Sequence, residues 1–414
     1  MTETTQDCPF INAPAQPVIS GPDGIRYDFN NGARVWVPEG DWRVRLSDDE
    51  TDNVLFDRHV SGGWVESTKK YYIAFRITVW KGNNPQPVVD HLMNLAHQNV
   101  LISFPVGTLG DLIGWVPYAE RFRHLTGANV LCSMAANLLD IFSDAYPALH
   151  FQSVENVKNN SQFVPYATYR IGLFFKGDTI NQPYDFRQVG LHRNAGHILG
   201  VDSTEIRPDL RRGSPRTIKE PYVCIATMST CQAKFWNNKT GWAEVITYLK
   251  NSGYRVLVID REAVVGEGFI WNRIPHGAED FTGDHPLKER IHLLEHAEFF
   301  IGLGSGLSWL AWACQIPVVM VSGFSLPGSE FHTPWRVINT HVCNGCWDDT
   351  GIDFDHHDFL WCPRHKNTDR QFECTRFITG NFVIKHIERL IETKKCTGDP
   401  TLLRGAKNET KPEL

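Results

Sequence analysis

The sequence lacks the patterns that mark several large classes of protein. Its 414 residues carry a formal net charge of −6, so no basic surface for nucleic acid or anionic lipid is expected. The N-terminal residues lack the basic start and apolar run of a secretory signal, which favours a cytoplasmic protein with reduced cysteines. The chain also has no phosphate-loop motif, no G-x-G-x-x-G fingerprint and no G-x-S-x-G nucleophile elbow.

A membrane-spanning segment is also not expected. The stretch between Glu298 and Glu330 carries no charge, but glycine, glutamine and proline interrupt it. A spanning helix needs about 20 mostly apolar residues in succession. We therefore predict a strand at 299–303, a helix at 307–314 and a strand at 316–321, without membrane insertion.

The remaining pattern predicts an α/β protein of several domains. Short alternating segments rich in β-branched and aromatic residues predict a small β-rich N-terminal domain. Strands then alternate with helices in two series, which predicts two Rossmann-like domains with a ligand cleft at the carboxyl ends of their strands. The expected boundaries are a flexible tail at 1–20, the β-rich domain at 21–98, Rossmann-like domains at 99–217 and 218–395, and a disordered tail at 396–414. The Pro-, Arg- and Gly-rich stretch 178–220 is expected to link the two lobes.

Three loops that follow predicted strands could carry chemistry. In Gly107–Asp111, glycines allow close approach of backbone N–H groups to a ligand, and Asp111 either serves the cleft or caps the helix that follows. In Met228–Trp236, hydroxyls and Lys234 could bind phosphate oxygens, or Lys234 could be an ordinary exposed lysine. In Gly304–Leu307, a helix N-terminus could bind a diphosphate, or the glycines could make a tight turn.

Four cysteines predict a metal site. Of the ten cysteines, Cys343 and Cys346 are separated by two residues, Cys362 follows after fifteen more, and Cys374 after a further eleven. Four thiolates can close around one tetrahedral metal and leave no position open for substrate, so a structural site is expected in a finger at 341–376. Zinc is the default ion for this ligand set, although sulfur ligands also suit iron. The intervening Asp355–Asp358 segment could add a ligand, but we expect it to be a polar surface loop.

A competing metal motif is His292-Leu293-Leu294-Glu295-His296, which matches the H-x-x-E-H pattern of some zinc peptidases. Two histidines four positions apart lie on the same face of a helix. The predicted helix lies between two strands of a parallel sheet, and no third ligand follows it. We expect a chance match.

These motifs together resemble the bacterial autotransporter heptosyltransferase family. The resemblance covers nearly the whole chain and includes YDFNNGARVWVPEGDWRVRL, FPVGTLGDLIGWVPYAERF, MSTCQAKFWNN, IGLGSGLSWLAWA and the cysteine-containing block at 343–374. The lobes are similar, more distantly, to those of lipopolysaccharide heptosyltransferases. The resemblance implies the GT-B glycosyltransferase fold with a small β-rich domain before it.

The resemblance also implies an activity and roles for residues. The implied reaction is inverting transfer of heptose from ADP-heptose to serine hydroxyls of an autotransporter adhesin. It implies that Asp111 is the general base, that Lys234 stabilises the ADP leaving group, and that the cysteines form an iron finger in a ring-shaped, dodecameric homo-oligomer. The implied donor-binding residues come from the three loops: Thr108, Leu109, Gly110, Ser229, Thr230, Gln232, Gly304, Ser305, Gly306 and Leu307.

Two other functions stay open from the residues alone. One is a glycosyltransferase that uses a different nucleotide sugar, which the nucleotide that stabilises the protein would reveal. The other is a noncatalytic protein that binds adhesins during assembly, which would bind without adding mass to its partner.

Overall fold

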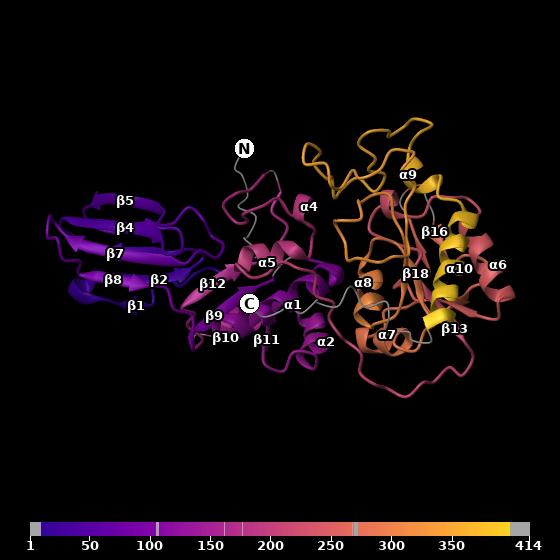
Figure 1. Ribbon diagram of the computed structural model, residues 1–414, viewed down its shortest axis with the longest axis horizontal. Helices are drawn as coiled ribbons and strands as arrows, with labels where there is room; N and C mark the ends of the chain where they lie inside the picture. Colours follow the sequence, from indigo (N-terminus) through magenta and orange to yellow (C-terminus); the bar gives the residue numbers. More distant parts are fainter. Residues whose placement is uncertain are drawn as a thin grey trace. The chain divides into compact units, whose positions relative to one another are not determined.

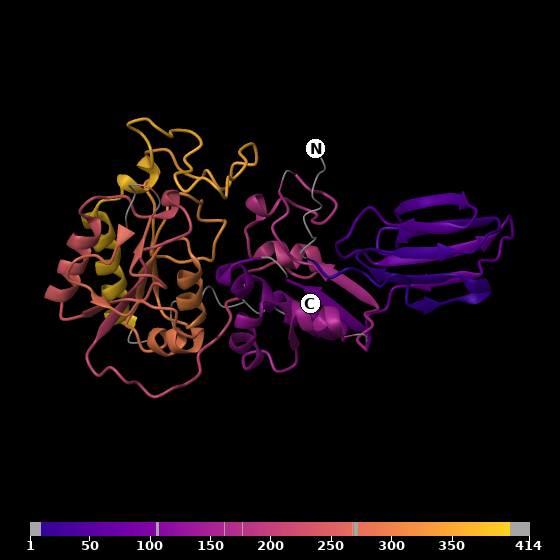
Figure 2. The same cartoon turned by 180° about the vertical axis from the view of Figure 1, so that it is seen from behind.

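The computed structural model describes residues 10–104, 107–160, 162–175, 177–266, 268 and 272–397. The chain divides into two compact units (Figures 1 and 2), each described by itself below. The first comprises Met1–Thr108 and Trp115–Ile206, and the second comprises Leu109–Gly114 and Arg207–Leu414. Among the described residues no helix is both long and apolar enough to cross a membrane.

The first unit contains a mixed sheet of eight strands. Its order is β11-β10-β9-β12-β2-β3-β6, with β1 paired to β2. The strands are β1 (Ile19–Ser20), β2 (Arg26–Asn30), β3 (Arg34–Val37), β6 (Gly63–Glu66), β9 (Asn99–Ser103), β10 (Asn129–Met134), β11 (His150–Ser153) and β12 (Ala167–Arg170). The parallel strands β9 and β10 are buried after their first residue, as expected of a sheet covered on both faces.

A second, antiparallel sheet in this unit has the order β5-β4-β7-β8. Its strands are β4 (Trp42–Asp48), β5 (Val54–Val60), β7 (Phe75–Lys81) and β8 (Val89–Leu92). Along β4 the buried Val44 and Leu46 alternate with the more exposed Arg43 and Arg45, so one face is apolar and the other polar. The predicted β-rich segment therefore forms two sheets, and one of them continues into the parallel sheet through pairing of β2 with β12.

Helices complete the first unit. They are α1 (Leu109–Thr126), whose first turn belongs to the second unit, η2 (Ala136–Leu138), α2 (Leu139–Ser143), α3 (Val154–Asn159), α4 (Phe186–Val189) and α5 (Arg193–Leu199), with η1 (Pro22–Gly24) before β2. The helices α4 and α5 lie in the stretch 178–220 that was expected to link the lobes. Only from Arg207 onward does that stretch belong to the second unit.

Residues 10–20 belong to the packed structure of the first unit, whereas the sequence suggested a flexible tail. Phe10 stacks on Phe174 with ring centroids 6.0 Å apart, and Ile11 is buried with Leu101 and Leu131. The apolar pair at 10–11 was too short to show a pattern, and its burial depends on this tertiary contact. The predicted C-terminal tail at 396–414 lies outside the described residues, apart from the end of α10.

The second unit is built on a parallel sheet of six strands with the order β17-β14-β13-β18-β19-β20. Numbered along the chain, this is the doubly wound order 3-2-1-4-5-6. The strands are β13 (Tyr222–Ile225), β14 (Arg255–Val258), β17 (Glu279–Asp280), β18 (Phe300–Gly302), β19 (Val318–Val321) and β20 (Arg336–Val337), and β15 (Val264–Val265) pairs with β16 (Asn272–Arg273) in a hairpin.

Helices cover both faces of this sheet. Figure 1 shows α6 and α10 side by side on one face and α7 with α8 on the other, and Figure 2 agrees. The helices are α6 (Gly241–Asn251), α7 (Leu287–Leu294), α8 (Gly306–Ala313), α9 (Glu373–Arg376) and α10 (Gly380–Thr397), with the short η3 (Gln232–Lys234). The apolar faces of α6 and α10 pack with the strands in one buried cluster. The predicted strand-helix-strand unit at 299–321 is confirmed as β18, α8 and β19.

Candidate functional site

The strand order of the second unit indicates a candidate binding site at its topological switch point. Chain connections leave β13 toward β14 in one direction, whereas β18, which also pairs with β13, continues toward β19 in the other. Ligands of doubly wound sheets bind outside the carboxyl ends of the two strands at this point. The loops that follow β13 and β18 are two of the three loops singled out in the sequence.

The loop after β13 is fixed by a buried carboxylate that sequence analysis missed. Asp260, just beyond β14, is 3% exposed and accepts hydrogen bonds from Thr227 N (2.7 Å), Thr227 Oγ1 (3.1 Å) and Met228 N (3.4 Å). Burial raises the pKa of Asp260 to about 6, although these hydrogen bonds and the nearby Arg290 act in the opposite direction. The position of Asp260 at the end of a predicted strand is the signal that could have identified it.

The rest of that loop includes η3, and its side chains differ in their exposure to solvent. Ser229 is half-buried and Thr230 is exposed. Gln232 is buried with both ends of its amide occupied: Nε2 donates to Asn237 Oδ1 (2.7 Å), and Oε1 accepts from Asn272 Nδ2 (2.9 Å). These hydrogen bonds make Gln232 a brace for the loop.

Lys234 ends the same loop against aromatic rings. Its Nζ lies 5.3 Å from the ring centroid of Phe324 and 5.8 Å from that of Trp347, within the range of cation–π interactions. The side chain is partly exposed. An ammonium held over two rings keeps a positive charge beside the loop of hydroxyls.

The loop after β18 leads into the N-terminus of α8. Ser305 occupies the N-cap position, but its side chain makes no capping hydrogen bond, and its Oγ is buried without a partner. The first N–H groups of a helix also lack partners within the helix. A buried, unsatisfied hydroxyl at the N-terminus of a helix, the positive end of the helix dipole, suits an anionic ligand.

The first turn of α1 contacts the first turn of α8 within the second unit. A methyl group added at Gly110 would lie 2.7 Å from Cδ1 of Trp309, and one added at Gly306 would lie 3.1 Å from Cβ of Leu109. The structure thus brings Leu109 and Gly110 of one predicted motif into contact with Gly306 of the other. Asp111, the third residue of α1, is 7% exposed. Thr108 is exposed, whereas Pro105 and Val106 of the same predicted motif lie outside the described residues.

An ion pair that the sequence did not reveal borders Gly304. Glu330 Oε2 accepts from Arg336 Nη1 at 2.6 Å, and both side chains are nearly buried. The other carboxylate oxygen of Glu330 lies so close to Gly304 that any side chain at that position would overlap it. Both residues follow β19, far along the chain from Gly304, so no local pattern connects them to Gly304.

The four cysteines of the predicted finger lie near one another. Burial, together with charge on the other cysteines, raises the pKa of both Cys346 and Cys374 to about 12. Gly345, between Cys343 and Cys346, has a φ of 70°, which lets the chain turn tightly between the two cysteines. The donor set fits a metal bound by sulfur, and thiols of this kind release their protons when the metal binds.

Other side chains near the finger serve as supports. The Sγ of Cys343 and ligand atoms of His365 and Glu373 lie within 4.8 Å of one another, which could suggest a second ligand set. However, the carboxylate of Glu373 already accepts from Cys343 N at 2.9 Å and from Arg370 Nη2 at 2.7 Å. The 355–358 segment is largely exposed, and Asp355 Oδ1 accepts from His357 N, as expected of a surface turn.

The H-x-x-E-H motif has a structural explanation. Glu295, at the end of α7, accepts hydrogen bonds from the backbone N–H groups of Arg212, Gly213 and Ser214 at 2.9–3.1 Å. His296 Nε2 lies 2.6 Å from the carbonyl oxygen of Ser214. The ligand atoms of His292, Glu295 and His296 are close enough for a metal, but they bind the segment that begins the second unit.

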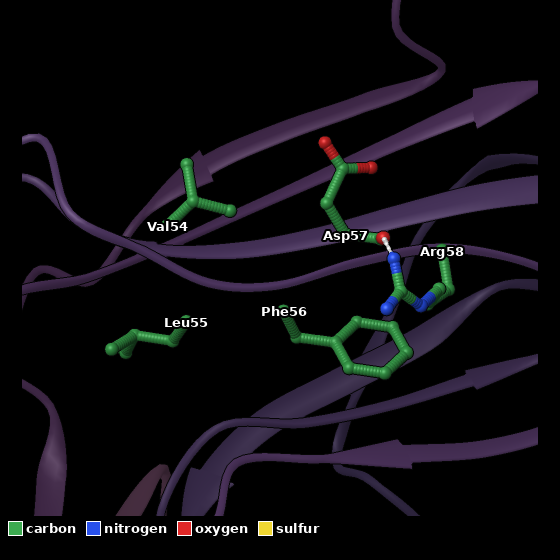
Figure 3. A pocket seen from close by; sticks show the side chains of 5 residues that line it. All are labelled: Val54, Leu55, Phe56, Asp57 and Arg58. Atoms are coloured by element: carbon green, nitrogen blue, oxygen red, sulfur yellow. Dashed lines mark hydrogen bonds between the residues drawn. The ribbon is translucent and has the colours of Figure 1, made fainter.

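A pocket of about 310 Å³ in the first unit does not belong to this site. Five consecutive residues of β5, Val54 to Arg58, line it (Figure 3). The Arg58 guanidinium donates to the main-chain oxygen of Asp57, and no residue of the three loops takes part. The pocket is the open groove along an edge strand, so the topology is the better guide to function.

Comparisons with known proteins agree with the fold and the motifs. Residues 21–83 match the profile of the N-terminal domain of glycosyltransferase TibC, and residues 192–353 match that of glycosyltransferase family 9 (heptosyltransferase). The autotransporter heptosyltransferase BAHTCr of Citrobacter rodentium is 60% identical over 401 residues, 97% of each chain. The autotransporter heptosyltransferase TibC of Escherichia coli is 58% identical over 97% of this chain and 98% of its own.

The structure of TibC extends the likeness to three dimensions. The crystal structure of this iron-containing dodecameric glycosyltransferase has a TM-score of 0.89, with 59% identity over 92% of this chain and all of the other. A second TibC structure holds ADP-D-β-D-heptose. A more distant relative, BimC of Burkholderia thailandensis, is 40% identical over 91% of this chain and 87% of its own, and is named an inactive autotransporter heptosyltransferase. The expected resemblance is confirmed, and the chain belongs to the autotransporter heptosyltransferase family, with the GT-B fold.

Proposed function

We propose that this protein transfers heptose from ADP-heptose to serine hydroxyls of an autotransporter adhesin, with inversion at the anomeric carbon. The observation that carries the proposal is the second unit's switch point, where the loop bearing Lys234 and the N-terminus of α8 follow adjacent strands. The TibC structure with ADP-D-β-D-heptose supports the same donor for this chain.

The diphosphate of the donor would bind between these two loops. Lys234 offers positive charge, Ser229 and Thr230 offer hydroxyls, and α8 offers its N-terminus with the buried hydroxyl of Ser305. Charge develops on the leaving phosphate as the glycosidic bond breaks, and preorganised donors stabilise it. Gly304, Gly306 and Leu307 would contribute backbone, while Gln232 would keep the lysine loop in place.

Asp111 would act as general base. In the proposed step, the serine Oγ forms a bond to the anomeric carbon, the bond to the ADP oxygen breaks, and ADP leaves with the electron pair. The serine proton passes to the Asp111 carboxylate. The first turn of α1, with Leu109 and Gly110, meets the first turn of α8, which supports a base close to the diphosphate end of the donor.

The cysteines Cys343, Cys346, Cys362 and Cys374 would hold one iron ion, as in TibC, and zinc is the chemical alternative. With four sulfur ligands the ion would stabilise the fold of the finger. We also propose a cytoplasmic homo-oligomer, with the dodecameric TibC as the precedent for its size. At 47.1 kDa per chain, native mass spectrometry would detect twelve copies at about 565 kDa.

The proposal is tested by intact mass spectrometry of a serine-rich adhesin passenger incubated with the protein and ADP-heptose. We expect additions of about 192 Da for each heptose transferred, rather than donor binding alone. Asp111→Asn should reduce transfer by about 10²–10⁴-fold, the usual contribution of a general base, while ADP affinity stays within a few-fold of the original. Normal transfer by Asp111→Asn would exclude this residue as the base.

The same experiment separates the rival functions. Mass additions with a UDP-sugar but not with ADP-heptose would keep the fold and replace the donor. The name of BimC as an inactive relative favours a noncatalytic adhesin-binding protein as the second candidate. That candidate predicts adhesin binding without mass addition from any nucleotide sugar.

A further inference from the structure

The finger and the lysine loop share an aromatic cluster, defined here as Phe324, Trp347, Phe354 and Trp361. Phe324 follows β19, and the other three lie between the cysteines of the finger. In five of the six pairs of these rings, the centroids are 4.8–5.9 Å apart. Phe324 and Trp361 are 5% exposed and pack with Cys231 and Ala233 of the lysine loop. The loop that carries Lys234 therefore rests on the finger.

Backbone contacts connect the same three segments. Gln232 N donates to the carbonyl of Phe359 in the finger at 2.9 Å, and Trp347 N donates to the carbonyl of Phe324 at 3.1 Å. Gly345 N, next to Cys346, donates to the carbonyl of Gly323 at 2.9 Å. These backbone hydrogen bonds join the finger to the segment of Phe324 and to the lysine loop. The positions of the rings relative to Lys234 are therefore fixed by main-chain contacts.

Among the described residues, two rings of the cluster lie within cation–π range of the Lys234 ammonium. The Nζ atom is 5.3 Å from the ring centroid of Phe324 and 5.8 Å from that of Trp347. A lysine side chain has a flexible four-carbon stem, and fixing it on binding a ligand costs conformational entropy. Because the two rings already hold the Lys234 ammonium in place, less entropy is lost when a phosphate accepts hydrogen bonds from it.

We propose that Phe324 and Trp347 are positioning residues that hold the Lys234 ammonium for the donor diphosphate, and that the metal finger supports donor binding through them. The inference rests on the proposed function, because it requires Lys234 to bind ADP. It gives the finger a role in donor affinity in addition to its role in stability. Since coupling between two binding sites is reciprocal, ADP should also increase retention of the finger's metal.

The test is a double-mutant cycle on ADP affinity, measured by calorimetry with the full-length protein. Phe324→Leu keeps an apolar side chain and removes the aromatic face, and we expect about 3- to 10-fold weaker binding, the size of one cation–π contact. Phe324→Tyr should restore the affinity. In a Lys234→Met background, Phe324→Leu should cause no further loss, because the partner of the ring is gone.

Phe354→Leu is the matched control, since this ring belongs to the cluster but not to the pair over the lysine. It should leave ADP affinity nearly unchanged. Equal losses from Phe354→Leu and Phe324→Leu would overturn the proposal, as would a loss that persists in the Lys234→Met background. Stronger ADP binding by Phe324→Leu would mean that the rings compete with the donor for the lysine.

Metal content provides a readout that does not depend on activity. At equilibrium with a chelator, ADP should increase the metal retained by the original protein but not by Lys234→Met. If Phe324→Leu loses metal, its weaker ADP binding could come from the damaged finger. The test then uses Trp347→Phe, which keeps an aromatic ring, and Trp347→Leu, which does not, and only the leucine variant should weaken ADP binding. Equal affinities for these two variants would overturn the proposal. If Lys234→Met itself leaves ADP affinity unchanged, the proposed role of Lys234 fails, and the inference fails with it.

Discussion

At the scale of single residues, Gly110 is a position where side-chain packing and helix propensity favour different residues. Position 110 lies in the first turn of α1, where alanine is favoured over glycine by up to about 1 kcal/mol. A Cβ at this position would lie 2.7 Å from Cδ1 of Trp309, a buried ring. The overlap should outweigh the helix preference, because inserting a methyl group into a packed site typically costs about 1–3 kcal/mol.

We therefore predict that Gly110→Ala lowers the melting temperature of the protein. Gly328→Ala is the control, since a Cβ there meets no atom within 4 Å and the residue is exposed. Its melting temperature should stay close to that of the original protein. A Gly110→Ala variant that melts at a higher temperature would show that helix preference dominates and that α1 and α8 can separate at little cost.

Asp260 should make stability depend on pH in a recognisable direction. Its pKa rises from 3.8 to about 6 on folding, chiefly through burial. The folded protein therefore keeps this proton up to a higher pH than the unfolded chain does. Stability from this group is greatest below about pH 4 and falls as the pH rises to about 6, by about 3 kcal/mol for two pKa units.

We predict that Asp260→Asn removes this component. The difference in melting temperature, variant minus original protein, should increase between pH 4 and pH 7. Only the original protein loses stability over this range, because its buried Asp260 must give up a proton. Subtracting the two proteins at each pH cancels the other titrating groups. A difference that stays constant over this range would contradict a raised pKa for Asp260.

At this scale the sequence predicted the positions with a local pattern. The four cysteines and the loops after β13 and β18 could be recognised from spacing and from the strands before them. Asp260 and the Glu330–Arg336 pair could not, because the loops that they contact, at Thr227 and at Gly304, are distant in sequence. The reach of Glu330 to Gly304 depends on where β19 and the segments after it lie in three dimensions.

At the scale of elements, Glu295 fastens the segment that enters the second unit onto α7. Its two oxygens accept from three consecutive backbone N–H groups and from Ser214 Oγ, which lies 2.5 Å away. Burial alone would raise the pKa of Glu295, but these hydrogen bonds together hold it below its ordinary value. A carboxylate is the side chain that can accept all of them at once.

We predict that Glu295→Gln loosens this segment, because the amide nitrogen cannot accept and leaves N–H groups unsatisfied. Hydrogen exchange at the amides of 212–214 should become faster, and trypsin should cleave sooner after Arg211 or Arg212. Glu289→Gln on the same helix, at an exposed side chain, is the control and should change neither. If the segment instead depended on a metal at His292 and His296, a chelator would produce the same loosening in the original protein.

Elements were predictable in proportion to their length and burial. The parallel strands β9, β10, β13, β14, β18 and β19 stand out as short apolar runs between helices, and α6 and α10 have clear amphipathic periods. The strands β17 and β20 have two residues each and carry no pattern of their own. They form because a neighbouring strand offers unpaired backbone groups, which is a property of the sheet.

At the scale of the whole molecule, the pairing of β2 with β12 was not predictable. Phe29 N donates to the carbonyl of Tyr166 at 3.0 Å, and Thr168 Oγ1 donates to Asn30 Oδ1 at 2.7 Å. These residues are more than 130 positions apart, and nothing in either segment specifies the other. The expected boundary between residues 98 and 99 stays a prediction, and the shared sheet suggests that the segments on either side fold together.

We predict that a variant lacking residues 10–98 does not give a soluble, folded protein. Removing β2 would expose the edge of β12 and the apolar surface that Phe29 covers, and such edges promote aggregation. A milder variant, Asn30→Ala, removes the hydrogen bonds of Asn30 to Thr168 and to the Pro165 carbonyl. It should lower the melting temperature while ADP, whose proposed site lies in the second unit, still binds with the original affinity. A soluble deletion variant with native circular dichroism would instead identify 21–98 as an independent domain, since the remaining sheet would then not need β2 for its stability.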